Sequence, residues 1–309
     1  MPKIISQEEQ LSRIKKRQEE LEEYINVEDQ GLTTYTNNGN LSPGCRACKA
    51  GRWVCLYSGR RCNADCFFCG IPYKDRRSWP IYPNRVGRGK PFLNDDIAKM
   101  IVFYKDHLSG FSFSGGETSL YYSQILDIFS YVADHAPKLY LWLYTNGSNW
   151  TGEQLRKMSE VADEIRFNLA AFDFDERVLE RLKIATGLFS RTAVEVPMTR
   201  RFYIWLTEEE NIYRLVEFGV NQINSAELVL DQEVAFREYS NEEQYEFESF
   251  FLSDVSPTIS RLLTYDLIEF VGKHNLPIVI NDCSQQTKFL QQIKMRENPI
   301  ADMLHQYDK

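Results

Sequence analysis

The sequence predicts an α/β protein in which a parallel sheet, open or curled into a barrel, is covered by helices on its outer side. Short apolar segments and helical segments alternate about six times after residue 50, and this alternation is typical of parallel sheets. The chain has 309 residues and is 43% hydrophobic, which is enough to bury a full core. Functional residues of such folds lie at the carboxyl ends of the strands, so motifs are expected there.

The expected strands are short runs rich in apolar and β-branched residues. They cover residues 53–57, 111–114, 139–144, 165–171, 192–196, 226–230 and 277–281.

The expected helices follow from apolar residues that recur at helical spacing. One amphipathic helix is predicted over 7–28, followed by a Gly-, Asn- and Thr-rich linker over 30–44. A helix capped by Asn94 has Ile97, Met100 and Ile101 on one face, and a later helix has the apolar face Ile125, Ile128, Phe129 and Val132. Two further helices are predicted to begin at capping boxes formed by Thr151 with Gln154 and by Thr207 with Glu210.

Charge and cysteine content narrow the class of protein. The net charge of -8 disfavours a nucleic-acid partner, and the absence of a long apolar run disfavours a membrane location. No secretion signal is apparent, and seven cysteines are an odd number, so we expect a cytoplasmic protein with reduced thiols that serve a metal or catalysis. Residues 74–90 carry mainly basic side chains, in contrast to the acidic chain as a whole. This segment is either a solvated loop or a surface for an acidic reductase or an anionic substrate.

Three cysteines follow the first expected strand. Cys62, Cys66 and Cys69 have the spacing Cys-x3-Cys-x2-Cys, and thiolates on such a short loop can converge on one soft metal centre. Three ligands around a 4Fe-4S cube leave one iron open to a further ligand. A zinc knuckle is the alternative, but zinc sites usually have a fourth nearby Cys or His, and no His follows within thirty residues.

This triad, with the aromatic Phe68 before its third cysteine, resembles the signature of the radical S-adenosylmethionine (SAM) superfamily. The resemblance implies that Cys62, Cys66 and Cys69 bind a 4Fe-4S cluster whose open iron holds SAM, with Phe68 near the adenine. It also implies a partial (βα)6 radical SAM barrel, a flavodoxin- or ferredoxin-like reductant, and a 5'-deoxyadenosyl radical that removes hydrogen from a small-molecule or peptide substrate.

Three further elements fit this resemblance. Gly115-Gly116-Glu117 ends the second expected strand and is similar to the Gly-Gly-Glu element that holds the SAM ammonium. Asn146 lies in a Thr-Asn-Gly sequence after the third strand, and Asn168 lies on the fourth; each is either a SAM contact or an ordinary turn or core amide. The fifth strand lacks a clear copy of the family's glycine-containing adenine motif.

Four cysteines lie outside the triad. Cys45, Cys48 and Cys55 precede it, and Cys283 follows the last expected strand. We expect an auxiliary iron-sulfur cluster on these residues, against a zinc site or plain buried thiols as the alternatives.

The sequence therefore predicts three regions: an amino-terminal helix with a cysteine-containing linker (1–50), a partial barrel (51–230), and a mostly helical extension with one further strand (231–309). A sulfur-inserting enzyme similar to lipoyl synthase and a glycyl-radical activase are alternatives within the family. A non-enzymatic iron-sulfur or zinc module is the alternative from a different class; it does not need Glu117 beside its cluster.

Overall fold

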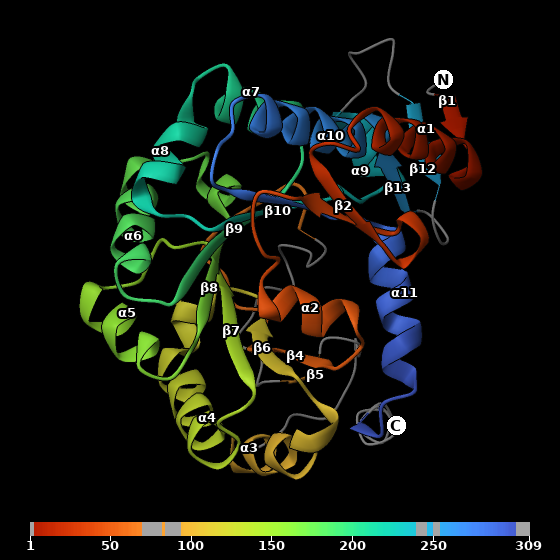
Figure 1. The fold of residues 1–309 in the computed structure, drawn as a ribbon. Helices are drawn as coiled ribbons and strands as arrows, with labels where there is room; N and C mark the ends of the chain where they lie inside the picture. Colours follow the sequence, from red (N-terminus) through yellow and green to blue (C-terminus); the bar gives the residue numbers. More distant parts are fainter. Residues whose placement is uncertain (1–2, 70–81, 84–93, 239–245, 250–253, 301–309) are drawn as a thin grey trace. The chain divides into compact units, whose positions relative to one another are not determined.

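The computed structural model describes residues 3–69, 82–83, 94–238, 246–249 and 254–300. The chain forms two compact units. Figure 1 labels their helices and strands. The larger unit contains Ser42–Asp65, Ile71–Val194 and Lys288–Lys309. The smaller unit contains Met1–Leu41, Cys66–Gly70 and Glu195–Thr287.

The larger unit is built on parallel strands, as the sequence predicts. In spatial order they are β4 (Trp53–Tyr57), β6 (Gly110–Ser114), β7 (Tyr140–Thr145), β8 (Glu164–Phe167) and β9 (Arg191–Pro197), whose last residues belong to the smaller unit. Strand β5 (Tyr82–Pro83) pairs antiparallel with β4. The structure is therefore the expected α/β partial barrel, with chain order and strand order in agreement.

Helices cover the outer face of these strands. They are α3 (Asn94–Phe103), α4 (Tyr122–His135), α5 (Gly152–Ser159) and α6 (Glu176–Thr186), with short 3-10 turns η3 (Lys105–His107), η4 (Thr118–Tyr121) and η5 (Leu169–Phe172). The predicted apolar face of α4 is buried, and its Phe129 packs edge-on against Phe111 of β6 at 5.6 Å between ring centres. The capping box of Thr151 and Gln154 is present at the start of α5.

The inner face of the same strands is polar and aromatic, because successive side chains of a strand point to opposite faces. Trp53 stacks on Trp142 at 5.6 Å between ring centres, and Arg166 lies over the ring of Trp142. Helix α2 (Pro43–Lys49) packs against β4, β6 and β7. It lies at their amino ends, since Ser42 donates a hydrogen bond to Glu164, the first residue of β8.

The smaller unit contains a second group of strands. Strand β10 (Gln222–Ala226) is parallel to β14 (Val279–Cys283), which pairs antiparallel with β3 (Thr33–Thr36), and β3 pairs with β2 (Ile25–Glu28). A separate sheet has the order β1 (Lys3–Ile5), β12 (Glu246–Ser249), β13 (Asp254–Pro257) and β11 (Leu230–Asp231). The helices are α1 (Gln7–Glu20), α7 (Arg200–Thr207), α8 (Asn211–Phe218), α9 (Gln232–Glu238), α10 (Thr258–Lys273) and the start of α11 (Gln285–Arg296), with the turn η1 (Asp29–Gly31).

The amino-terminal helix ends earlier than the sequence predicts. Helix α1 stops at Glu20, and Ile25–Glu28 forms β2, which pairs with β3 inside the segment predicted to be a linker. All four residues of β3, Thr33–Thr36, are buried. Their β-branched and aromatic side chains fit a buried strand, although the surrounding Gly and Asn residues are typical of a loop.

The sixth strand and one capping box also differ from the prediction. Strand β10 covers Gln222–Ala226 instead of the predicted 226–230. Polar side chains can be buried in this strand because they form hydrogen bonds with one another: Gln222 and Asn281 both donate to the side-chain oxygen of Asn224. Thr207 ends α7 and donates to the carbonyl oxygen of Tyr203, so it caps no following helix. Among the described helices, none combines the length and the apolar composition that a membrane span requires.

Candidate functional site

Cys62, the first cysteine of the triad, lies five residues after the end of β4. The sulfur of Cys62 accepts a hydrogen bond from the backbone N–H of Ala64 at 3.4 Å, and the side-chain amide of Asn146 lies 3.8 Å from it. Cys66 and Cys69 are joined by a backbone hydrogen bond of 3.1 Å. Cys62 belongs to the larger unit, whereas Cys66 and Cys69 belong to the smaller one. Donors directed at a sulfur favour its thiolate form, which is the form that binds iron.

Gly115 and Gly116 let two loops approach each other closely. Gly115 has φ of 110°, and a Cβ atom on Gly116 would lie 2.1 Å from the carbonyl oxygen of Arg61. The backbone N–H of Gly116 donates to Gly59, and that of Glu117 donates to Arg61. Only glycine fits at these positions, so the Gly-Gly-Glu turn fixes the backbone that leads into Cys62.

Glu117 is buried, with 1% of its surface exposed. Its carboxylate accepts hydrogen bonds from the Thr145 hydroxyl at 2.6 Å, the backbone N–H of Asn146 at 2.7 Å and the backbone N–H of Ser119 at 2.9 Å. Burial raises the pKa of Glu117, and the three hydrogen bonds oppose that rise. The carboxylate therefore links the end of β6 to the end of β7.

Asn146 continues this chain of contacts toward the cysteine loop. Its side-chain amide donates to Asn63 at 2.9 Å, and Asn63 in turn donates to Ser148 at 2.7 Å. Gly147 has φ of 75°, and a Cβ atom there would meet the ring of Phe167. The sequence of contacts Gly116, Glu117, Asn146 and Cys62 thus joins the carboxyl ends of three neighbouring strands, where the fold predicts a site.

Asn168 follows β8 at the same end of the strands. Its backbone N–H donates to the carbonyl oxygen of Thr145 at 2.8 Å. Its side-chain oxygen is buried and has no hydrogen-bond partner within the described residues. A buried acceptor without a partner costs about 1 to 3 kcal/mol, so this atom is suited to a hydrogen-bond donor from a bound molecule.

Phe68 lies in the smaller unit and is half-buried. It packs against a small apolar cluster of that unit, made of Leu228, Leu230, Ala235, Phe247 and Val255. The placement of its ring near an adenine stays a prediction.

The upstream cysteines lie on two packed elements of the larger unit. Cys45 and Cys48 are one turn apart on α2, and Cys55 is in the middle of β4; Cys45 and Cys55 are buried. Cys283 ends β14 in the smaller unit. Among residues with a described placement, no three His, Cys, Asp or Glu side chains are close enough to hold a metal ion. Both clusters are therefore assignments from the sequence.

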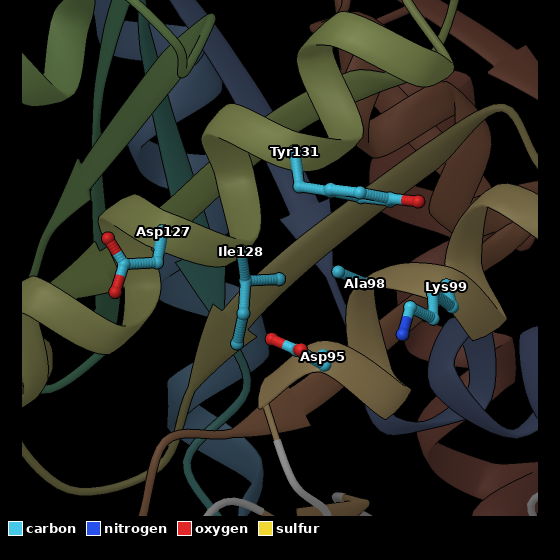
Figure 2. Close-up of a pocket in the computed structure, with 6 residues that line it drawn as sticks. All are labelled: Asp95, Ala98, Lys99, Asp127, Ile128 and Tyr131. Atoms are coloured by element: carbon cyan, nitrogen blue, oxygen red, sulfur yellow. The ribbon is translucent and has the colours of Figure 1, made fainter.

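Two other features lie apart from these residues. The basic segment 74–90 falls outside the described residues except for Tyr82 and Pro83, so its proposed docking role stays a prediction. A cavity of about 160 Å³ lies between α3 and α4 (Figure 2). It is lined by Asp95, Ala98, Lys99, Asp127, Ile128 and Tyr131, none of which the sequence assigned to a site.

Sequence reasoning missed several residues that build the site. The carbonyl groups of Gly59 and Arg61 and the side chains of Asn63 and Thr145 connect the motifs to one another. Thr145 belongs to the same Thr-Asn-Gly sequence as Asn146, so that motif could have identified it as a site residue. The backbone carbonyls carried no sequence signal, because any residue type supplies them.

Comparison with known proteins agrees with this arrangement. Residues 56–196 match the family model of the radical SAM superfamily, and this range contains the cysteine triad, Gly115–Glu117, Asn146 and Asn168. This part of the chain therefore carries the features of that superfamily. No curated protein matches the sequence.

Solved structures show the same fold at low sequence identity. SuiB from Streptococcus suis matches with 12% identity and a TM-score of 0.52, covering 76% of this chain and 49% of SuiB. SuiB bound to its precursor peptide SuiA matches with 13% identity and a TM-score of 0.51, covering 74% of this chain and 48% of that one. The chain thus spans about half the length of SuiB.

Proposed function

We propose that this protein is a radical SAM enzyme that reductively cleaves SAM at a 4Fe-4S cluster held by Cys62, Cys66 and Cys69, and that the resulting radical removes hydrogen from a small-molecule or peptide substrate. The main support for this proposal is the chain of contacts that runs from Gly116 through Glu117 and Asn146 to Cys62. It fixes one thiol with donors directed at its sulfur. Asn168, whose side-chain oxygen is a buried acceptor, follows β8 at the same end of the strands.

The types of residue present suit the proposed cofactors. Three thiols supply soft ligands and leave one iron position for SAM, which supplies radical chemistry when it is bound. The Asn146 amide stabilises negative charge on Cys62, and the Asn168 oxygen is available to a donor such as a ribose hydroxyl. Glu117 remains our candidate for the SAM ammonium; in that role it would exchange at least one of its three present hydrogen bonds for the ligand.

We propose a second iron-sulfur cluster on Cys45, Cys48 and Cys55, with Cys283 as a candidate fourth ligand. Helix α2 packs on β4, which brings the elements that carry the first three thiols together. Two donors of this region, Lys49 Nζ and Trp142 Nε1, are buried without a hydrogen-bond acceptor in the described residues. Thiolate sulfurs carry negative charge and would satisfy such donors.

The substrate and the partner belong to the same proposal. SuiB was solved with a precursor peptide, and its fold is shared here, which supports a peptide among the candidate substrates. We propose a flavodoxin- or ferredoxin-like protein as the electron donor. We also propose a cytoplasmic location, because thiols stay reduced there.

The test is anaerobic reconstitution with iron and sulfide, followed by addition of SAM and dithionite. We expect 5'-deoxyadenosine and methionine from the intact protein and none from the Cys62→Ala, Cys66→Ala, Cys69→Ala triple variant. Equal SAM cleavage by that variant would remove the triad from the reaction, and no cleavage by the fully loaded intact protein would remove the reaction itself.

A further inference from the structure

Three polar side chains form a closed ring of hydrogen bonds beside Cys62. The side-chain N–H of Asn146 donates to the oxygen of Asn63 at 2.9 Å, and the side-chain N–H of Asn63 donates to the Ser148 hydroxyl at 2.7 Å. The Ser148 hydroxyl donates in turn to the side-chain oxygen of Asn146 at 2.7 Å. All three residues belong to the larger unit. We call Asn63, Asn146 and Ser148 the amide ring.

The amide ring fixes the direction in which the Asn146 carboxamide points. The backbone N–H of Ser148 also donates to the side-chain oxygen of Asn146, at 3.0 Å, and a backbone N–H can only donate. The oxygen of Asn146 must therefore face Ser148, and its NH₂ group must face the cysteine loop. One N–H of this group is used by Asn63, and the other is directed at the sulfur of Cys62, which lies 3.8 Å from the nitrogen.

The bonds of the amide ring all run in one direction, because each member donates once and accepts once within it. Hydrogen bonds arranged in this way strengthen one another, and turning one carboxamide around would break its contacts on both sides. Asn146 is buried, with 6% of its surface exposed, whereas Asn63 is exposed and Ser148 is half-buried. The two outer members hold Asn146, and Asn146 contacts the sulfur.

The sulfur of Cys62 has two N–H groups directed at it. One belongs to the backbone of Ala64, at 3.4 Å, and the other to the side chain of Asn146. N–H donors stabilise negative charge on a sulfur atom. When an iron-sulfur cluster takes up an electron, its sulfurs share the added negative charge, so hydrogen bonds to them raise the reduction potential of the cluster.

We propose that Asn63 and Ser148 are positioning residues, which hold the Asn146 amide on the Cys62 sulfur and thereby raise the reduction potential of the cluster bound there. The proposal deepens the proposed radical SAM function and rests on it. In the reductive step one electron passes from an external one-electron reductant to the cluster. The amide ring makes that transfer more favourable and itself exchanges neither a proton nor an electron.

The test measures the midpoint potential of the reconstituted cluster, followed by electron paramagnetic resonance in a redox titration without SAM. The variants are Asn63→Ala, Ser148→Ala and the double variant, and Ser148→Thr keeps the hydroxyl group. Two substitutions serve as matched controls. Asn149→Ala removes an exposed asparagine from the same loop, and Ser159→Ala removes a half-buried hydroxyl that donates to the carbonyl oxygen of Arg156 at 2.8 Å.

We expect each single variant to keep its iron and to have about three- to tenfold less reduced cluster at a fixed applied potential. The double variant should lower the potential no further than the stronger single variant, because both changes act through Asn146. Ser148→Thr and the two controls should match the intact protein. Unchanged potentials in both single variants, additive shifts in the double variant, or loss of the cluster from both single variants would each overturn the proposal.

The amide ring can also be tested in metal-free protein by nuclear magnetic resonance. The side-chain NH₂ protons of Asn146 should exchange with solvent more slowly than those of the exposed Asn149, and Asn63→Ala should remove much of this difference. Equal exchange at Asn146 in Asn63→Ala and in the intact protein would overturn the ring. Failure of the intact protein to bind any cluster would instead overturn the proposed function, and the exchange result would still stand.

Discussion

The carbonyl oxygen of Arg61 lies 2.1 Å from the position that a Cβ atom on Gly116 would occupy. This contact joins the Gly-Gly-Glu turn to the backbone that precedes Cys62. The two motifs recognised separately in the sequence are therefore parts of one packed site, and a change in either should disturb the other.

Replacement of Gly116 by alanine should lower iron content at the cysteine loop and destabilise the protein by at least about 1 to 3 kcal/mol, because the backbone of Arg61 must move to admit the methyl group. Chemical denaturation and iron analysis measure the two effects. Gly152→Ala is the control: nothing lies within 4 Å of a Cβ atom there, so we expect unchanged or slightly raised stability. Full iron content in Gly116→Ala would contradict the proposal that the Gly-Gly-Glu turn holds the cysteine loop in place.

Glu117→Gln separates two roles of the carboxylate. If Glu117 pairs with the SAM ammonium, SAM binding should weaken by about 1 to 3 kcal/mol while the first cluster keeps its iron. The substitution also replaces an acceptor oxygen by an NH₂ group beside Thr145 and Asn146, so some loss of thermal stability is expected. Equilibrium binding of SAM to the reconstituted protein decides: an unchanged affinity with lowered stability would leave Glu117 a purely structural role.

Iron content distinguishes one cluster from two. The reconstituted protein should bind about eight irons, and the Cys62, Cys66 and Cys69 alanine variant about four. Cys45→Ala with Cys48→Ala should remove the other four and leave the SAM-dependent cluster spectrum in place. Protein that never exceeds about four irons, or that holds zinc at the upstream cysteines, would rule out the second cluster but not the first.

Stability should fall as the pH rises through the neutral range, because of a buried carboxyl group in the smaller unit. Burial, with the nearby charge of Glu227, raises the pKa of Glu248 from 4.5 to about 8, so the folded state keeps a proton that the unfolded state releases. The group's contribution to stability is therefore fully present below about pH 4.5 and is lost as the pH approaches 8.

Chemical denaturation of the intact protein and of Glu248→Gln across pH 5 to 9 checks this. We expect a decline on the order of a few kcal/mol in the intact protein and a flatter profile in the variant, since glutamine has no proton to release. Glu153→Gln is a suitable control, because Glu153 is exposed on α5. Parallel profiles for Glu248→Gln and the intact protein would show that Glu248 does not hold the proton.

The sequence alone predicted the alternation of strands and helices, the face of α4, the capping box at Thr151, and the motifs around Cys62, Glu117 and Asn146. These features depend on spacing over a few residues, and periodicity and side-chain chemistry are visible at that range. The tertiary structure decided which polar residues are buried. The strand at Gln222–Ala226 could not be predicted from its own residues. Its amide side chains can be buried only because Asn281, which is distant in sequence, forms a hydrogen bond with them in the folded protein. The same reason explains the burial of Glu117 and the position of α2: Thr145, Arg61 and Glu164 are distant in sequence, and only the folded chain brings their hydrogen-bonding groups within reach.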